Sequence, residues 1–412
     1  MFKIRHSNRI WVIYKDVHYY YIYNDMSRIL VVGGDGFCGW PLSMHLSSIG
    51  HFVFIADNLS RRLIDTEIGA NSLTPIADYW DRIQTWNNVG NPKFKMKGFN
   101  IDIAKEYERL KLIIKQNNID VIVNLGEQRS APYSMKNSTT ARYTVDNNLN
   151  CNNNILQAIV ETNQNIHYVH LGTMGVYGYG PIKDVTIPEG YIDVEYQGKM
   201  VNILHPAYPG SIYHLTKTQD ALFFQFYAKN WGLKITDLHQ GIIWGFKTPE
   251  TELHEDLANR FDYDSDYGTV LNRFIIQSAI GYPLTVYGNG GQTRAFININ
   301  DSMKCIQLAI ENPPKKGDRV EIFNQMTETH KLTSLVERIK EANPNTQVDY
   351  LDNPRNELAE NDLTVENKKF INLGLKPIYL DKENIIDLLE HCKKHSNRIN
   401  QEIIKPMSFW KR

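Results

Sequence analysis

The sequence predicts an α/β fold in which a doubly wound parallel sheet is joined to a smaller C-terminal lobe. Three observations lead to this prediction. Apolar runs that suit buried strands alternate with helical stretches up to about residue 245, and a glycine-rich turn follows the first of these runs. The chain, at 412 residues, is also too long for one small core. Alternation of this kind is typical of βαβ units, whose parallel sheets are covered by helices on both faces.

The expected elements follow one another as strand, helix and strand. An apolar run at 28–32 precedes a helical pattern at 40–49, and the strand HFVFIAD occupies residues 51–57. Later strands are expected in DVIVNLG, IHYVHLG and KITDLHQG, which are residues 120–126, 166–172 and 234–241. Beyond Gly245 the pattern loosens into an acidic, aromatic stretch at 248–266, where we expect the second lobe to begin.

The composition excludes several classes of protein. Hydrophobic residues make up 42% of the chain and charged residues 22%, as in ordinary globular enzymes. The formal net charge of −1, without any Lys/Arg run, argues against a nucleic-acid partner. No apolar run reaches the roughly 18 to 20 residues of a membrane helix. The four scattered cysteines form no C-x-x-C pair, so we expect reduced thiols, a cytoplasmic location and no metal site.

Residues 1–27 are basic and aromatic and lack the small-residue cleavage site of a secretory signal. We expect them to be an appended extension, or to lie upstream of a true start at Met26, because the residues after Met26 lead directly into a strand. They also lack the Ser-rich, acid-poor character of a chloroplast transit peptide, which favours a prokaryotic cytoplasmic enzyme.

The turn VVGGDGFCGW places Gly33, Gly36 and Gly39 between a strand and a helix. Glycines there allow a tight turn and the close approach of a pyrophosphate to the helix N-terminus. An ordinary strand-to-helix turn would also use glycine, but Asp57 ends the next strand, where a carboxylate accepts hydrogen bonds from ribose hydroxyls. The pattern therefore predicts a Rossmann-type site for NAD. Arg61 and Arg62 leave NADP as the minor option, because arginines can hold a 2′-phosphate.

Further cofactor contacts are expected along the carboxyl edge of the sheet, where open α/β sheets bind ligands. Asp102 and Ile103 follow a strand-like run and could meet the adenine. The remaining candidates on this edge and around the glycine turn are Phe37, Cys38, Asn58, Leu125, Gly126, Glu127, Arg129 and Asn147.

The stretch GSIYHLTKTQD sets Tyr213 and Lys217 four residues apart, which is one turn of a helix. The ammonium can then favour the phenolate and lower the pKa of Tyr213, and a phenolate can take a proton from a sugar hydroxyl. Lys217 could also hydrogen-bond the nicotinamide ribose. On its own a Y-x-x-x-K pattern is weak, but the upstream cofactor turn gives it a function.

With the glycine turn, Asp57 and the Y-x-x-x-K pattern in this order, the chain resembles the extended short-chain dehydrogenase/reductase superfamily. The runs GEQRSAPYSM, LGTMGVYG, GTVLNRF, PLTVYGNGGQTR and NPRNE make it similar to one branch, the UDP-sulfoquinovose synthase family, from residue 28 to about 406. The resemblance implies conversion of UDP-glucose and sulfite to UDP-sulfoquinovose with a tightly bound NAD. It implies oxidation at C4, loss of water across C5 and C6, sulfite addition at C6 and reduction of the C4 ketone.

The resemblance also implies roles for individual residues. Tyr213 is the base at the C4 hydroxyl, Lys217 is its partner, and Thr173 of LGTMG bonds the sugar. Related 4,6-dehydratases carry acidic residues after this threonine, whereas Met174 and Gly175 follow here. Neither can donate a proton. His214 is our candidate for the acid, with a purely structural histidine as the equal alternative.

For the substrate, Arg294 and Arg355 match positions where relatives bind the diphosphate or its ribose, a task that suits the bidentate guanidinium. Gln240, Asn272 and Thr285 are weaker candidates for the diphosphate or uracil. Arg129, with Gln128, could orient NAD or receive sulfite, and the residues leave both roles open.

The sequence also predicts how the chain divides into lobes, and it leaves alternative functions open. Residues 28–245 would mainly bind NAD and residues 246–412 mainly the UDP-sugar, with some chain exchange between the lobes. A UDP-sugar 4-epimerase or dehydratase on the same scaffold is the alternative enzyme, and a non-catalytic dinucleotide sensor would not need the proton-transfer residues. We expect a homodimer by analogy with the superfamily. The sequence does not identify any protein that would deliver sulfite.

Overall fold

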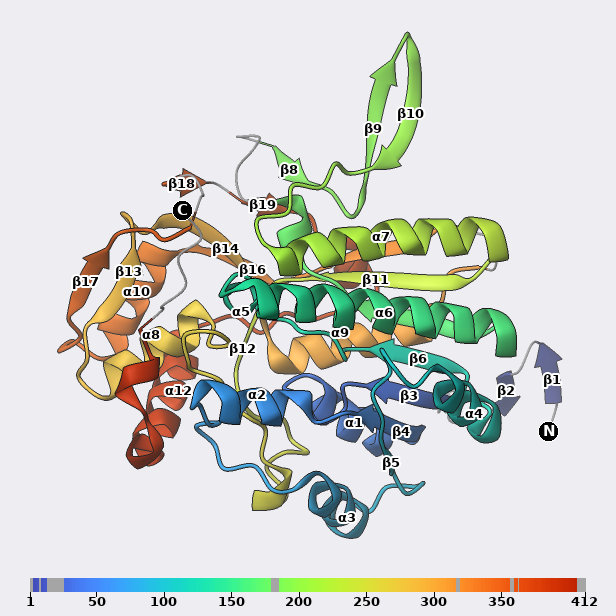
Figure 1. The fold of residues 1–412 in the computed structure, drawn as a ribbon, viewed down its shortest axis with the longest axis horizontal. Helices are drawn as coiled ribbons and strands as arrows, with labels where there is room; N and C mark the ends of the chain where they lie inside the picture. The colour runs from blue at the N-terminus through green and yellow to red at the C-terminus, as the bar shows by residue number, and fades with distance from the viewer. Residues whose placement is uncertain are drawn as a thin grey trace.

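The computed structural model describes residues 3–6, 9–12, 26–178, 185–315, 319–355, 359–361 and 363–405, so most of the N-terminal extension lies outside the described residues. Its centre is a seven-stranded parallel sheet in the order β15-β11-β7-β6-β3-β4-β5 (Figure 1). The strands are β3 (Arg28–Val32), β4 (Phe52–Asp57), β5 (Lys97–Asn100), β6 (Val121–Asn124), β7 (His167–Leu171), β11 (Lys234–Gln240) and β15 (Glu321–Gln325). This is the doubly wound architecture that the sequence predicts.

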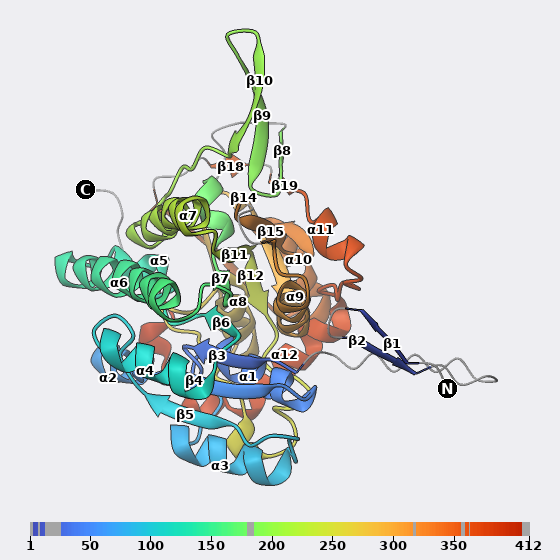
Figure 2. The ribbon, with the colours of Figure 1, turned by 90° about the vertical axis from the view of Figure 1, so that its right-hand side faces the viewer.

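Helices cover both faces of this sheet, and Figure 2 shows α6 and α7 on one side with α1 and α9 on the other. The first face carries α4 (Tyr107–Asn117), α6 (Ser138–Thr162) and α7 (Ile212–Trp231), and the second carries α1 (Gly39–Ser48), α3 (Tyr79–Val89) and α9 (Ile299–Glu311). Because successive side chains of a strand point to opposite faces, Ile29 and Val31 of β3 pack in one core and Leu30 and Val32 in the other.

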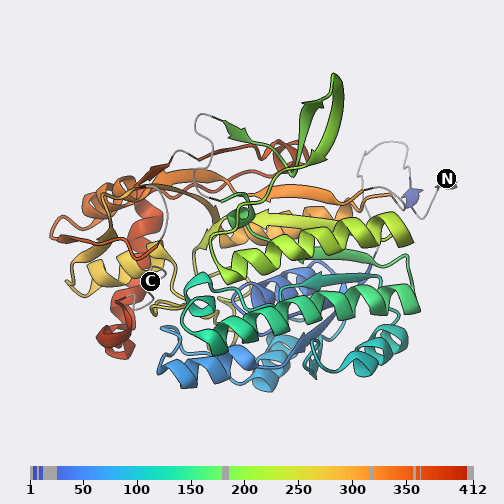
Figure 3. The ribbon, with the colours of Figure 1, turned by 45° about the horizontal axis from the view of Figure 1, so that its top comes forward.

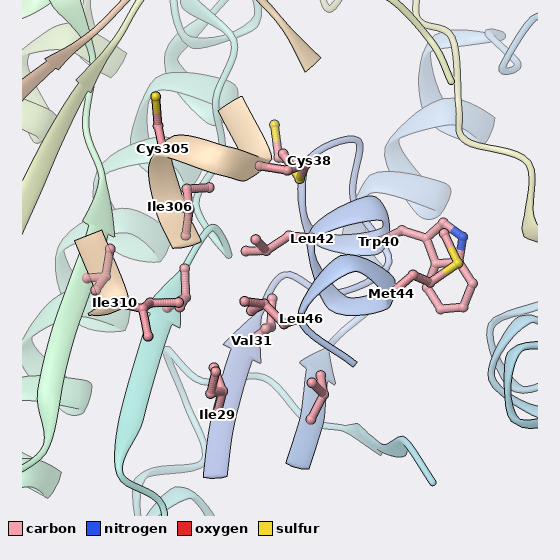
Figure 4. Packing of buried hydrophobic residues seen from close by; sticks show 14 of the residues in the cluster. Ile29, Val31, Cys38, Trp40, Leu42, Met44, Leu46, Cys305, Ile306 and Ile310 are labelled. Carbon is pink, nitrogen blue, oxygen red and sulfur yellow. The ribbon is translucent and has the colours of Figure 1, made fainter. Parts of the chain in front are cut away.

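The core under the glycine turn is tightly packed. Figure 4 shows Ile29 and Val31 of β3 facing Leu42 and Leu46 of α1, with Ile306 and Ile310 of α9 on the same side. The helix α1 therefore packs against both the sheet and α9. Burial of this kind contributes roughly 1.5 to 3 kcal/mol for each large apolar side chain, which holds the turn before α1 in one place.

The strand order reverses between β3 and β6, because the chain builds β3-β4-β5 outwards and then returns to the other side of β3. Helices after neighbouring strands leave in opposite directions at such a point, and a crevice opens at the carboxyl ends of the strands. The glycine turn after β3 and the loop after β6 border this crevice.

A second lobe is built around its own core from α8 (Val270–Ala279), α10 (Leu332–Ala342), α12 (Lys382–Lys394) and two small sheets. The sheets contain β12 (Ile242–Trp244), β14 (Gly291–Asn298) and β16 (Glu328–Lys331), and β13 (Leu284–Tyr287) with β17 (Val348–Leu351). In Figure 3 these elements lie at one end of the molecule, beside the ends of the central strands. Two elements from this half of the sequence, α9 and β15, belong to the large domain, so the chain passes between the lobes.

Two features have no counterpart among the expected elements. The strands β9 (Tyr191–Tyr196) and β10 (Lys199–Leu204) form a hairpin that projects from the body of the protein (Figure 1). Strand β8 (Thr186–Ile187) pairs with β19 (Thr364–Val365), far along the chain. Within the described residues, no helix has the length and apolarity that a bilayer crossing demands.

Candidate active site

The glycine turn forms a close cradle between β3 and α1. Gly33 has a φ of +78°, a conformation that favours glycine, and a Cβ there would lie 2.6 Å from the carbonyl oxygen of Leu125. A Cβ on Gly39 would lie 1.9 Å from the carbonyl oxygen of Gly33. Side chains at these positions would collide with the backbone around the turn, so only glycine allows the close packing that a pyrophosphate-binding turn requires.

Asp57 ends β4 beside this cradle, and its orientation is fixed. Its carboxylate accepts hydrogen bonds from the backbone N–H of Asp35 at 2.9 Å and of Leu59 at 2.7 Å. Each oxygen retains a lone pair that can accept a further donor such as a ribose hydroxyl. Burial, together with the negative charge of Asp35, raises the pKa of Asp57 to about 6. The residues of the turn and Asp57 thus fit the adenosine half of a dinucleotide.

The two arginines after Asp57 are occupied by acidic partners. Arg62 makes a bidentate ion pair with Asp35, with nitrogen–oxygen distances of 2.6 and 2.9 Å. Arg61 pairs with Asp65 and lies 3.1 Å from Asp262. Arg61 lines the crevice but Arg62 does not. The sequence proposed both as cofactor contacts, and for Arg62 the structure shows a different role, as the partner of Asp35.

The catalytic candidates lie at the start of α7, in the wall of the same cavity. Ser211 caps this helix by accepting from the N–H of His214, which places Tyr213 and Lys217 in its first two turns. Tyr213 hydrogen-bonds with the hydroxyl of Thr173, which itself caps a short 3₁₀ helix, η1 (Met174–Tyr177). The three residues of the predicted proton-transfer set are therefore brought together.

The pKa of Tyr213 differs from the expectation. Burial raises it above the ordinary value, and the charge of Lys217, although it acts in the opposite direction, does not compensate. The predicted lowering is therefore wrong, because the sequence pattern shows the ammonium but not the depth at which the phenol lies. The positive charge of a bound nicotinamide ring would act in the same direction as Lys217.

Lys217 is surrounded by acceptors that the sequence did not predict. Its Nζ atom lies 3.0 Å from Oε1 of Glu127 and donates to the carbonyl oxygen of Leu171 at 2.7 Å. Glu127, His170 and Asp220 place three potential metal ligands within 4.8 Å of one another. The ammonium lies among them, 3.0 Å from His170 Nε2, so an amine cation occupies this cluster.

His214 lies in the cavity wall beside Gly175. Its ring packs on Gly175, where a Cβ would approach Nε2 to 2.3 Å, and its Nδ1 lies 3.1 Å from the hydroxyl of Ser211. Burial, followed by the positive charges of Arg355 and Arg294, lowers its pKa to about 3. In this state the imidazole is neutral at neutral pH. A bound diphosphate would compensate the two arginines and raise the pKa of His214.

A segment of the second half, residues 259–269, contributes to the cavity wall. Arg260 pairs with Asp65 at 2.6 Å, Asp262 pairs with Arg129, and Asp266 pairs with Lys136 at 2.7 Å. These contacts connect the segment to α2 (Ser60–Ile68) and to the loop after β6. Arg129 thus lies in the cavity wall, held by Asp262. The sequence indicated this stretch only as acidic and aromatic, because its partners lie far away along the chain.

Most sequence-predicted residues line one cavity. They are Gly33, Gly36, Phe37, Cys38, Gly39, Asp57, Asn58, Arg61, Asp102, Ile103, Leu125, Gly126, Glu127, Arg129, Asn147, Thr173, Tyr213, His214, Lys217, Gln240, Arg294 and Arg355. Besides Arg62, the structure leaves two substrate candidates outside this wall. Asn272 donates to the backbone oxygen of Asp262, and Thr285 bonds with Gln277.

The cavity wall also contains residues that the sequence analysis did not select. Arg273 is buried, with an unbonded Nε and its guanidinium 5.7 Å from the ring of Tyr287. Among the described residues, no carboxylate forms an ion pair with it. The phenolic oxygen of Tyr287 is likewise buried and unbonded. The sequence offers one signal for this residue, because Arg273 directly follows Asn272 in GTVLNRF.

The comparisons with known proteins agree with this geometry. Residues 29–324 match the model of the NAD dependent epimerase/dehydratase family. The chloroplastic UDP-sulfoquinovose synthase of Spinacia oleracea is 40% identical over 389 residues, which cover 93% of this chain and 79% of that protein. The UDP-sulfoquinovose synthase of Sulfolobus acidocaldarius is 36% identical over 398 residues, which cover 93% and 98%.

Solved structures share the fold. UDP-glucose 4-epimerase from Thermotoga maritima, in complex with UDP-glucose, superposes with a TM-score of 0.65 at 20% identity, covering 89% of this chain and 98% of that one. UDP-glucuronic acid 4-epimerase from Bacillus cereus, with UDP-glucuronic acid and NAD, gives 0.64 at 20% identity, covering 89% and 99%. Given the identities of the spinach and Sulfolobus proteins over nearly the whole chain, the protein belongs to the UDP-sulfoquinovose synthase family, within the NAD-dependent epimerases and dehydratases.

Proposed function

We propose that the protein converts UDP-glucose and sulfite into UDP-sulfoquinovose, with NAD as a cofactor that is regenerated in each cycle. The observation that carries this proposal is the identity of 40% and 36% to two synthases along almost the entire chain. The site supports it, because one cavity joins the glycine turn, the Tyr213–Lys217 pair and the two arginines of the second lobe. Residues 28–245 would mainly hold NAD, and residues 246–412 mainly the UDP-sugar.

The chain's own residues supply proton transfer and charge compensation. Bound NAD provides a reversible hydride acceptor. Tyr213 is placed to take the proton of the C4 hydroxyl and to return it when the C4 ketone is reduced, and Lys217 stabilises the phenolate in the interval. Thr173, hydrogen-bonded to Tyr213, is placed to bond the same sugar hydroxyl. The C4 ketone acidifies C5, which allows loss of water across C5 and C6 and addition of sulfite at C6.

Two anionic groups must be held in the cavity. Arg294 and Arg355, whose charges reach His214, suit the diphosphate, and Arg273 adds a third buried guanidinium to this wall. Arg129 is one candidate for sulfite, because its side chain retains 36% exposure while it pairs with Asp262. An anion in the cavity would compete with Asp262 for this guanidinium.

We also propose a homodimer. Helix α7 leaves Leu215, Leu222 and Phe226 exposed at 38%, 61% and 53%. Their spacing of seven and four residues places them on one face of the helix, which lies beside α6 on the outside of the molecule (Figure 3). A second copy related by a two-fold axis would bury this stripe against itself. The four cysteines are buried and free, which fits the predicted cytoplasmic location.

Incubation of the purified protein with UDP-glucose, with and without sulfite, tests the function. Mass spectrometry should find a sulfonated UDP-sugar only when sulfite is present. Formation of UDP-galactose without any sulfonated product would instead favour the 4-epimerase, and a released 4-keto-6-deoxy sugar would favour the dehydratase. If UDP-glucose is not converted at all, the result would favour a non-catalytic protein that only binds the dinucleotide.

A further inference from the structure

A buried chain of hydrogen bonds leads from Lys217 away from the cavity, and the proposed reaction gives it no role. Oε1 of Glu127, which lies 3.0 Å from Lys217 Nζ, is also 2.7 Å from His170 Nε2. The other ring nitrogen of His170 lies 2.8 Å from Oδ1 of Asp237. His170 is fully buried and Asp237 nearly so. The catalytic ammonium is thus connected to β7 and β11, the strands that carry His170 and Asp237.

The chain continues beyond Asp237. Its second oxygen lies 3.0 Å from Nε2 of His239, and Nδ1 of His239 lies 2.7 Å from the hydroxyl of Tyr177. Tyr177 belongs to η1, the short helix that Thr173 caps. One end of the network therefore lies on α7 and the other on η1, and both elements contribute residues to the cavity wall.

The contacts of His170 favour a ring that donates at both nitrogens. Both ring nitrogens face carboxylate oxygens, and an ionised carboxylate can only accept, so a proton on each nitrogen satisfies both carboxylates, although Nε2 also lies 3.0 Å from Nζ of Lys217. The remaining groups around the ring are the ammonium of Lys217, an oxygen of Asp220 at 4.0 Å and the rings of Tyr168 and Phe224. Burial raises the pKa of Asp220 well above its ordinary value, with the charge of Glu127 as a further cause.

The charges of this cluster form two compensated pairs. Glu127 and Asp237 are negative, and the charges of Lys217 and His170 outweigh the effect of burial and lower the pKa of Glu127 to about 2. For Asp237, His239 and His170 outweigh burial and lower the pKa below its ordinary range. A cationic His170 would compensate part of the negative charge of Glu127. Without it, Lys217 alone would compensate that charge.

We propose that His170, held as a cation by Asp237, is a positioning residue that acts through Glu127 to fix the direction and the charge balance of the Lys217 ammonium. This inference rests on the proposed function, because it assigns Lys217 the role of stabilising Tyr213. Nζ of Lys217 contacts Glu127 and the Leu171 carbonyl and also lies 3.0 Å from His170 Nε2, so these contacts fix the direction in which the ammonium points. Loss of the His170 charge would leave one more negative charge close to Tyr213 and disfavour its phenolate.

Two substitutions separate charge from shape. His170→Gln removes the positive charge and keeps a donor, whereas His170→Lys keeps a cation between the two carboxylates. His167→Gln is the matched control, because His167 lies in the same strand, is also buried and contacts β11 through the Thr236 hydroxyl at 2.8 Å. His167 makes no described contact with Glu127 or Lys217. Absorbance of the reduced cofactor in a single turnover with UDP-glucose, recorded against pH, is the measurement.

We expect His170→Gln to move the pH profile of cofactor reduction towards higher pH. At neutral pH the rate should fall by about 10- to 100-fold, the range in which residues behind a functional group usually act. His170→Lys should restore most of the rate and the profile, and His167→Gln should leave both unchanged. An unshifted profile in His170→Gln, equal losses in the Gln and Lys variants, or the same shift in His167→Gln would each overturn the proposal.

The test is separable from the proposed function. Cofactor reduction by a UDP-sugar precedes sulfite addition, so a wild-type protein that reduces NAD but forms no sulfonate disproves the synthase and leaves this test intact. If the wild type does not reduce NAD, the ionisation of Tyr213 can be measured directly from its phenolate absorbance. This absorbance is the difference between each protein and the same protein with Tyr213→Phe added. It should appear at a higher pH in His170→Gln than in the wild type. An unchanged phenolate titration would contradict the proposal. Should His170→Gln not fold, Asp237→Asn keeps the shape, removes the anion that favours the cation, and should shift the profile in the same direction.

Discussion

At the scale of single residues, Tyr213 carries the most specific chemistry of the site. Its phenol is buried between Thr173 and Lys217, so its proton can exchange only with groups that enter the cavity. We predict that Tyr213→Phe loses roughly 10²- to 10⁴-fold in turnover, the usual contribution of a general base. Calorimetric binding of UDP-glucose should remain nearly intact. A comparable loss of affinity would mean that the hydroxyl binds the sugar and does not transfer its proton.

The pKa of Asp57 gives retention of NAD a pH dependence. The carboxylate must be ionised to accept hydrogen bonds from both ribose hydroxyls, and its pKa in the free protein is about 6. Protonation removes acceptor capacity, so NAD affinity should be constant above this pH and weaken as the pH falls through it. Equilibrium titration of NAD between acidic and neutral pH measures this. Asp57→Asn should bind more weakly, by roughly 0.5 to 1.5 kcal/mol for each lost hydrogen bond, and should show no such pH dependence.

The role of His214 concerns the source of the proton for the C6 hydroxyl that leaves as water. The neutral imidazole of the free protein cannot serve as the acid, but compensation of Arg294 and Arg355 by a diphosphate would raise its pKa towards neutrality. If His214 is the acid, His214→Asn should reduce the cofactor and then stall, with a 4-keto sugar bound. Single-turnover absorbance would show persistent reduced cofactor. Normal formation of the sulfonated product by this variant would assign His214 a structural role.

At the scale of elements, α7 presents different kinds of residue on its two faces. Tyr213 and Lys217 point into the cavity, whereas Leu222 and Phe226 lie exposed on the outer face. We predict that Leu222→Glu together with Phe226→Glu converts the dimer to a monomer, because the charges would have to be buried in the apolar contact. Sedimentation velocity measures the change. Leu112→Glu on α4 is the control, since Leu112 is 54% exposed and lies outside the stripe. A wild type that sediments as a monomer would contradict the proposed interface.

The elements that the sequence predicted well are those with local signals. The strands at 28–32 and 51–57 are continuous apolar runs, and the turn between them has glycines where the backbone must approach a ligand. The hairpin of β9 and β10 was not predicted, although alternate residues on one face, such as Val194 and Val201, are apolar. Its two strands pack mainly on each other, so few of their positions must be apolar and the pattern gives a weak signal.

The parts of the site that could not be predicted depend on pairs that are distant in sequence. Arg62 was assigned to the cofactor, but its partner Asp35 is 27 residues away and appears in the sequence only as a residue of the glycine turn. The contact between Asp262 and Arg129 spans 133 residues. Charges of this kind show no periodicity, so only the folded chain reveals which of them compensate one another and which remain for a ligand.

At the scale of the whole molecule, the two lobes are joined by the 259–269 segment and by the return of α9 and β15 to the large sheet. The ion pairs of that segment tie it to α2 and to the loop after β6, so the cavity wall is built from both lobes. The central claim is that the cavity would hold one NAD throughout the cycle, so that the hydrogen removed from C4 would return to the same sugar after sulfonation.

Conversion of UDP-glucose deuterated at C4, in the presence of sulfite, tests this claim most directly. The hydride should remain in the cavity, so mass spectrometry of the product should find a sulfonated UDP-sugar that retains the deuterium at C4. A product without sulfonate, or a sulfonated product whose C4 deuterium has been replaced by hydrogen, would contradict the account.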